Sequence, residues 1–151
     1  MTYFLGIDAG GSNCRARLID AQGTVIGEGR AGAANARIGL EALYETLNAT
    51  INEAVAQAGL TTTQRAAIAG GIGIAGITRP GVQDGLDAFD FGLASCRYAT
   101  DAQIANLGAN AGEDGAILII GTGSIAQLRI AGEDHTIGGY GFPISDEGSG
   151  A

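Results

Sequence analysis

One pattern occurs twice in this chain: a short apolar segment runs into a glycine-rich turn, and a second strand-like segment follows. The first copy occupies residues 3–18, with its turn at 8–13, and polar and apolar residues alternate after the turn. The second copy occupies residues 116–130, with its turn at 121–124. A strand, a glycine turn and a second strand in the same order predict two related structural units.

When the sequences of the two copies are aligned, three positions carry identical residues. Gly11 then aligns with Gly123, Ser12 with Ser124 and Arg17 with Arg129. Because turn residues and strand pattern repeat together, we predict a duplicated fold whose second unit begins near Gly115.

Hydrophobic periodicity predicts a mixed α/β fold around these turns. Strands are expected at 3–8, 13–18, 24–28, 66–77, 95–99, 116–120 and 125–130, and helices at 39–58, 82–94 and 101–109. The helix at 39–58 carries apolar residues at spacings of three and four, and Gly59 is placed to end it. The strand at 66–77 is expected to be buried on both faces.

Charge and composition exclude several classes of site. The chain has 16 acidic and 8 basic residues, and every base is an arginine, so the net charge is −8. A chain without lysine cannot form a Walker A P-loop or the lysine contact of protein kinases. An acidic balance without a basic run argues against nucleic acid and anionic membranes as partners. The absence of a secretory leader and of a long apolar run predicts a cytoplasmic protein.

The cysteines and the histidine give no metal or disulfide pattern. Cys14 and Cys96 are expected to be small core residues, and His135, between acidic neighbours, a solvated turn residue.

Both glycine turns can present backbone N–H groups to phosphate oxygens. Ser12, Thr122 and Ser124 add hydroxyl donors, and Asp8 can hold a magnesium ion through water. The alternative is that both are ordinary hairpin turns, but their repetition favours a nucleotide site.

Asp101 stands where a predicted strand passes into a predicted helix, so its carboxylate could accept a proton from a substrate hydroxyl. The alternative role is that of a helix N-cap. Asp146 and Glu147 could likewise be loop acids. Two further glycine patterns, at 71–76 and 121–126, fit the dinucleotide-binding fingerprint, which would require a helix at 125–130 where the repeat predicts a strand.

Four segments together resemble N-acetylglucosamine and glucosamine kinases: residues 5–18, 100–102, 121–124 and 138–150. These kinases belong to the benzoyl-CoA-reductase-activator-like ATPases of the sugar kinase, actin and heat-shock chaperone superfamily. The resemblance implies ribonuclease-H-like lobes with a mixed sheet that close on ATP, Mg²⁺ and a sugar. It implies a first lobe over residues 1–112 and the beginning of a second, duplicated lobe over 113–151.

The resemblance also implies roles for individual residues. Phosphate binding falls to Asp8, Gly10, Gly11, Ser12 and Asn13 in the first turn and to Gly121, Thr122, Gly123 and Ser124 in the second. Sugar binding falls to Asn35, Asp101, Gly138, Gly139 and Asp146, with Asp101 as the base acting on the 6-hydroxyl.

The implied activity is phosphorylation of the 6-hydroxyl of an amino sugar by ATP, in a cytoplasmic homodimer of which this chain is an N-terminal portion, inactive alone. The alternatives are an activator-type ATPase and a non-catalytic sugar sensor. Many relatives have Thr-Lys where this chain has Ser12-Asn13, and Trp is common at the position of Tyr140. The second difference leaves the substituent on the sugar nitrogen open. The cluster-binding cysteines of the activators are not found, which favours a kinase.

Overall fold

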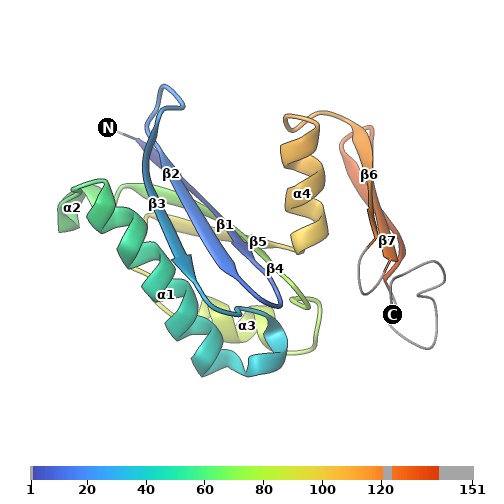
Figure 1. Cartoon of the computed structure of the whole chain (residues 1–151), viewed down its shortest axis with the longest axis horizontal. Coiled ribbons are helices and arrows are strands. Elements are labelled where there is room, and N and C mark those ends of the chain that lie inside the picture. Colours follow the sequence, from blue (N-terminus) through green and yellow to red (C-terminus); the bar gives the residue numbers. More distant parts are fainter. Residues whose placement is uncertain (1, 121–123, 140–151) are drawn as a thin grey trace. The chain divides into compact units, whose positions relative to one another are not determined.

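The computed structural model describes residues 2–120 and 124–139 of the chain, which divides into two units, Met1–Asp101 and Ala102–Ala151 (Figure 1). No helix in these described ranges is long and apolar enough to cross a membrane. The first unit holds strands β1 (Tyr3–Ala9), β2 (Cys14–Ile19), β3 (Val25–Ala31), β4 (Ile68–Ile74) and β5 (Ser95–Ala99), the 3₁₀ helix η1 (Ala36–Ile38), and helices α1 (Leu40–Gln57), α2 (Thr62–Arg65) and α3 (Val82–Asp87). The remaining elements are α4 (Asp101–Ala109), β6 (Gly115–Ile120), β7 (Ser124–Ile130) and β8 (Glu133–Gly138).

The first unit is built on a five-stranded sheet in the order β3-β2-β1-β4-β5. Strands β1, β4 and β5 are parallel, whereas β2 and β3 are antiparallel to their neighbours. Side chains of β1 alternate strictly: Leu5 and Ile7 are buried, and Phe4 and Asp8 are exposed. The sheet therefore has one core face, on which α1 packs, and one open face.

Two glycines allow α1 to lie directly on β3. A Cβ atom at Gly29 would overlap the carbonyl oxygen of Thr50, and one at Gly27 would overlap that of Ala54. The helix backbone therefore occupies the space that side chains would fill on any other strand residue. In return, α1 buries its apolar stripe against the sheet, including Leu47.

The outer edge of β3 is covered by side chains from the same helix. The backbone N–H of Glu28 donates to Gln57 Oε1, and that of Arg30 donates to Glu53 Oε2 at 2.6 Å. These bonds satisfy backbone donors that an edge strand would otherwise offer to another chain.

Arg65 fixes the loop that leads into β5. Its guanidinium donates to the carbonyl oxygen of Phe91 through Nη2 at 2.7 Å and to Asn52 Oδ1 through Nη1 at 2.5 Å. The ring of Tyr44 on α1 stacks on Phe89 with centroids 4.3 Å apart. The loop is thereby anchored to both α1 and α2.

The second unit contains a three-stranded antiparallel sheet in the order β6-β7-β8. Asn106 of α4 donates to the carbonyl oxygen of Gly115 at 3.3 Å, which connects helix and sheet. Gln127 is fully buried and accepts from the Thr136 hydroxyl at 2.8 Å. The face of this sheet opposite to Gln127 carries exposed apolar side chains, namely Leu118, Ile120, Ile130 and Ile137.

Most of the predicted elements are confirmed, three expectations were wrong, and two elements were missed. The helix expected at 82–94 ends at Asp87, and β4 has one face that is not fully buried, because Gly71 is exposed. Strand β8 and helix α2 were not predicted. His135 consequently lies in β8 opposite Leu128, and not in a turn.

The duplicated hairpins share their order but not a residue-by-residue register. In the first hairpin, Ile7 pairs with Ala16. The aligned residues of the second hairpin are Ile119 and Leu128, but Ile119 pairs with Ile125. The alignment on the glycines therefore does not extend through both flanking strands. Helix α4 belongs by its contacts to the second unit, and the predicted lobe boundary after residue 112 stays a prediction.

Candidate active site

The parallel strands of the first unit bring two candidate carboxylates to one edge of the sheet. In the register of β1, β4 and β5, Asp8 lies beside Gly73, and Gly73 lies beside Ala99. Asp101 follows two residues after Ala99, at the start of α4. Because the carboxyl ends of parallel strands share one edge, Asp8 and Asp101 stand on the side where α/β proteins usually bind ligands.

The first glycine turn closes at this same edge. The backbone N–H of Gly10 donates to the carbonyl oxygen of Asn13 at 2.9 Å, which joins β1 to β2. Gly11, Ser12 and Asn13 are exposed, and no atom lies within 4 Å of the position that a Cβ of Gly11 would take. The backbone between these residues is therefore accessible to an anion.

Two backbone hydrogen bonds fix the segment that carries Asn35 over the carboxyl ends of β1 and β4. Ala34 N–H donates to the Gly10 carbonyl oxygen, and Ala36 N–H donates to that of Ala75, both at 3.0 Å. Asn35 Oδ1 accepts from the backbone N–H of Arg37 at 2.9 Å and caps η1. Its amide NH₂ is the remaining group that can donate to a sugar hydroxyl.

Asp8 offers an exposed carboxylate on the open face of the sheet. The described residues form no cluster of three or more histidine, cysteine or acidic side chains that could enclose a metal. Mg²⁺ is commonly held by one or two carboxylates, with water and substrate phosphates filling its other positions. A single carboxylate beside the Gly10–Asn13 turn fits that mode of binding.

Asp101 is the first residue of α4 and is half-buried. A carboxylate at this position is favoured by the helix dipole, so its location agrees both with a proton acceptor and with a helix cap. The two roles of Asp101 share this position and differ in whether its carboxylate accepts a proton from a substrate.

The second unit holds only part of the predicted site within the described residues. Gly121, Thr122, Gly123 and Asp146 lie outside them. Ser124 begins β7, and its carbonyl oxygen accepts from the backbone N–H of Gly139 at 3.0 Å. Gly138 and Gly139 have φ of 80° and 74°, and a Cβ at Gly138 would lie 3.1 Å from that oxygen. The structure therefore places these two glycines directly beside Ser124.

Residues 125–130 form a strand, so the dinucleotide-binding alternative is wrong. That fingerprint requires a helix whose N-terminus meets the pyrophosphate. The pattern at 71–76 also fails, because α3 begins only at Val82.

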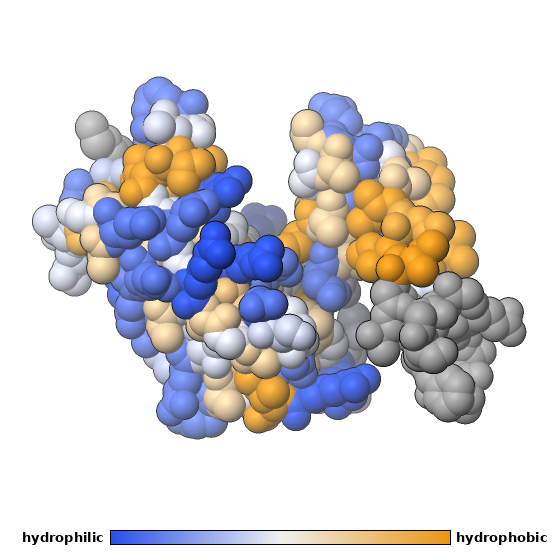
Figure 2. Space-filling model, in the orientation of Figure 1, coloured by the Kyte–Doolittle hydropathy of each residue, from blue (hydrophilic) through white to orange (hydrophobic). Residues whose placement is uncertain are grey.

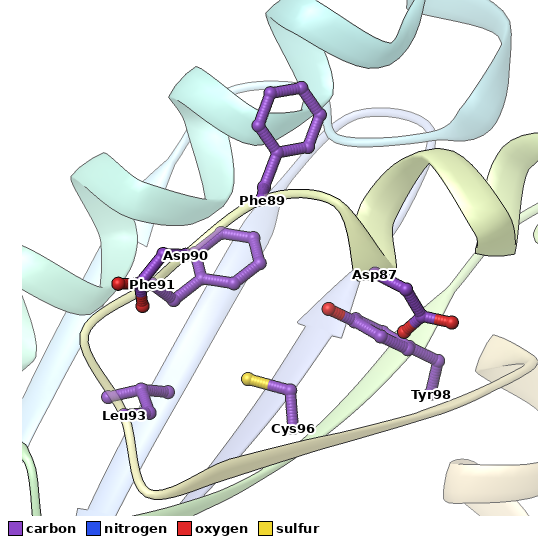
Figure 3. A pocket seen from close by; sticks show the side chains of 7 residues that line it. All are labelled: Asp87, Phe89, Asp90, Phe91, Leu93, Cys96 and Tyr98. Atoms are coloured by element: carbon purple, nitrogen blue, oxygen red, sulfur yellow. The ribbon is translucent and has the colours of Figure 1, made fainter.

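A cavity of about 200 Å³ lies beside β5 on the core side of the sheet, lined by Asp87, Phe89, Asp90, Phe91, Leu93, Cys96 and Tyr98 (Figure 3). Sequence reasoning missed it, although the alternation at 95–99 places Cys96 and Tyr98 on one face. Burial raises the pKa of the Tyr98 phenol, and nearby Cys96 and Asp87 raise it further. Asp8 occupies the opposite face, so this cavity is separate from the candidate site.

The cysteines lie as interior residues of the first unit. Cys14 is fully buried, and Cys96 is half-buried. Burial raises the pKa of both thiols. The expectation of a core residue is confirmed for Cys14, whereas Cys96 borders the cavity.

A mixed sheet in this strand order, opened by an antiparallel hairpin and covered by a helix after the third strand, is the ribonuclease-H-like fold of actin-like sugar kinases. Residues 5–151 match the BadF/BadG/BcrA/BcrD ATPase family, and the chain belongs to this family.

Individual relatives carry the names of amino-sugar kinases. The chain is 40% identical to glucosamine kinase GspK of Vibrio cholerae serotype O1, over 100% of this chain and 51% of the relative. It is 31% identical to the N-acetylmuramic acid/N-acetylglucosamine kinase of Clostridium acetobutylicum, over 99% and 50% of the two chains. The crystal structure of a proposed N-acetylglucosamine kinase from Chromobacterium violaceum matches with a TM-score of 0.86 and 31% identity, over 97% and 52%. The chain thus spans about half the length of the curated relatives it matches.

Proposed function

We propose that the whole protein transfers the γ-phosphoryl group of ATP to the 6-hydroxyl of an amino sugar, glucosamine or N-acetylglucosamine. This proposal depends mainly on one observation. Asp8, the Gly10–Asn13 turn and Asp101 all lie at the same edge of the first sheet. Membership of an ATPase family supports ATP as the donor. The similarity to kinases named for glucosamine and N-acetylglucosamine supports the acceptor.

Phosphoryl transfer depends mainly on positioning and on charge stabilisation, and the candidate residues suit both tasks. Asp101 accepts the proton of the sugar 6-hydroxyl as the hydroxyl oxygen attacks the γ-phosphorus of ATP, and the bond to the bridging oxygen breaks to release ADP. The backbone N–H groups of residues 10–13 hold phosphate oxygens in the first unit. Residues 121–124 take the corresponding role in the second.

The sugar is held by hydrogen bonds to its other hydroxyl groups. Asn35 donates through its amide NH₂, and we assign Gly138, Gly139 and Asp146 to sugar binding as well. Asp8 would hold Mg²⁺ through water, and the bound ion would supply positive charge to the phosphates.

The proposal also covers the cellular location of the whole protein and the molecules it binds. A net charge of −8 with no lysine supports a protein that binds neither nucleic acid nor an anionic membrane. We assign the whole protein to the cytoplasm and expect a homodimer.

The test is to incubate the whole protein with MgATP and a panel of sugars, and to measure ADP release and the phosphorylated sugar. We expect release that depends on glucosamine or N-acetylglucosamine. ADP release without any sugar would identify an activator-type ATPase. Sugar binding without ADP release would identify a sensor, and either result would refute the kinase proposal.

A further inference from the structure

The arginines of this acidic chain are unevenly distributed. Three of the eight guanidinium groups have partners: Arg17 pairs with Glu28, Arg129 pairs with Asp134, and Arg65 donates to the carbonyl oxygen of Phe91 in the loop before β5. Within the described ranges, no acidic side chain lies within ion-pair distance of the other five, which are Arg15, Arg30, Arg37, Arg79 and Arg97.

Four of these five arginines belong to segments at the carboxyl edge of the first sheet. Arg15 lies near the start of β2 and Arg30 near the end of β3, which the antiparallel pairing brings to the same edge. Arg37 lies in η1, and Arg79 lies in the turn after β4. Only Arg97 lies elsewhere, in the middle of β5.

Arg15 and Arg30 are paired directly opposite each other in β2 and β3. Both are exposed on the open face of the sheet, where hydrophilic side chains gather over β2 and β3 (Figure 2). Like charges directly opposite each other on a sheet destabilise the pairing. Asp8, opposite Arg15 on β1, supplies one negative charge to this row, so the two arginines leave a net positive charge that a bound anion can offset.

The position of this pair indicates which anion it meets. Across the sheet, Arg15 is also opposite Asp8 on β1, so the three side chains share one row of the open face. That row lies two residues from the Gly10–Asn13 turn. Guanidinium groups bind phosphate oxygens through charge-assisted and often bidentate hydrogen bonds.

We propose that Arg15 and Arg30 bind the phosphate chain of the nucleotide and supply the side-chain positive charge that lysine provides in other phosphate sites. This inference rests on the proposed function, because it assumes that the turn beside the pair is a nucleotide site. The carboxylate of Glu53 accepts from the backbone N–H of Arg30 at the outer edge, so it orients the strand without pairing with the guanidinium.

The test compares Arg15→Gln and Arg30→Gln with Arg97→Gln in the whole protein. Affinity for MgATP and for magnesium tripolyphosphate is measured by titration calorimetry. We expect each of the first two variants to weaken both affinities by about tenfold, as for the loss of a charge-assisted hydrogen bond. Arg97→Gln removes the same charge from the same face and should leave both affinities within about twofold, because Arg97 lies away from the turn.

A second measurement separates binding from folding. Arg15→Gln should leave the thermal midpoint of the free protein nearly unchanged, since it removes both the repulsion from Arg30 and the attraction to Asp8. Equal losses in all three variants would overturn the proposal, because they would reflect net charge alone. Loss of binding to inorganic phosphate or to the phosphorylated sugar, with tripolyphosphate binding intact, would also overturn it.

This experiment and the test of kinase activity fail separately. Arginine-dependent binding of tripolyphosphate without sugar phosphorylation would sustain the anion pair and refute the kinase. Sugar phosphorylation together with unaltered nucleotide affinity in both variants would sustain the kinase proposal and refute the binding of phosphate by the arginine pair.

Discussion

At the scale of single residues, Asp101 decides whether the candidate site is catalytic. Its place at the start of α4 suits both a base and a helix cap. Replacing it by Asn keeps the shape and hydrogen-bonding capacity but removes the proton acceptor. The two roles therefore predict different consequences for the same substitution.

We predict that Asp101→Asn lowers kcat of the whole protein by about 10²–10⁴-fold, the usual contribution of a general base, while nucleotide and sugar affinities stay nearly unchanged. Steady-state kinetics and calorimetry measure the two effects. A normal kcat in Asp101→Asn, together with a lower melting temperature in Asp101→Ala, would assign Asp101 to helix capping instead, because Asn caps a helix as well as Asp does and Ala does not.

Asp114 is a residue whose structural role depends on pH. Its carboxylate accepts from the backbone N–H groups of Ala131 at 2.5 Å and Gly132 at 3.0 Å, in the turn between β7 and β8. These backbone bonds, first that of Gly132 and then that of Ala131, lower the pKa of Asp114 from its ordinary value of 3.8. A lowered pKa in the folded state stabilises the turn above the unfolded value.

We therefore predict that this stabilisation is present above pH 3.8 and is lost as the pH falls through the lower, folded pKa. The amide resonances of Ala131 and Gly132 should shift together in that acidic range when followed by NMR. In Asp114→Asn the shift should vanish, and in Glu113→Gln, a neighbouring control, it should persist. A midpoint above 3.8 would contradict the hydrogen-bonding pattern.

At the scale of elements, the contact between α1 and β3 depends on glycine. Gly29→Ala should destabilise the first unit by about 1–3 kcal/mol, the typical cost of overpacking, because the new methyl group would meet the Thr50 carbonyl. Gly6→Ala is the matched control, since no atom lies within 4 Å of its Cβ position on the open face. Urea unfolding measures both; equal midpoints would show that α1 can move away without cost.

The turn between β7 and β8 explains an element that the sequence did not reveal. Ile130 pairs with Glu133, so Ala131 and Gly132 form a two-residue connection, and both have positive φ, 52° and 78°. This is the geometry of a type I′ turn, whose usual signal is Asn-Gly or Asp-Gly. Because Ala occupies the first position, the hairpin carries no recognisable turn signal.

Ala131→Asn should consequently stabilise the second unit by about 0.5–1 kcal/mol, since Asn tolerates the left-handed region better than Ala. The rise should appear as slower hydrogen exchange of the β7 and β8 amides. Gln22→Asn, which introduces the same residue in a turn of the first unit, is the control and should leave this exchange unchanged. Faster exchange in Ala131→Asn would contradict the turn assignment.

What the sequence predicts and what it misses have distinct physical causes. The long helix α1 and strand β5 follow from apolar periodicity and from a glycine at the helix end, both of which act locally. The open face of β4, exposed at Gly71, depends on which elements pack on the sheet, which no local pattern contains. For the site, the common edge of Asp8 and Asp101 and the opposition of Arg15 and Arg30 both depend on strand order and register, which the sequence pattern does not contain.

At the scale of the whole molecule, the second unit presents an unusual surface. Leu118, Ile120, Ile130 and Ile137 are exposed by 66%, 63%, 56% and 64% on one face of its sheet. Figure 2 shows apolar surface over β6 and β7. Contiguous apolar surface of this kind favours association with another surface.

We predict that the 151-residue chain, expressed by itself, self-associates through this face and binds ATP weakly or not at all. Light scattering should give a mass that rises with concentration, and calorimetry should detect little heat with MgATP. Ile137→Lys should reduce association by introducing a charge that would have to be buried at the contact. Gln22→Lys adds the same charge to an exposed turn of the first unit and should leave association unchanged.

Three outcomes would contradict this assignment of the surface. A monodisperse monomer that binds ATP with micromolar affinity would show that the apolar face needs no cover and that the nucleotide site is complete in this chain. Equal effects of Ile137→Lys and Gln22→Lys would show that association responds to net charge. Association that persists in Ile137→Lys while the first unit keeps its near-ultraviolet circular dichroism would point to another surface, because the β6–β8 face would then no longer be the contact.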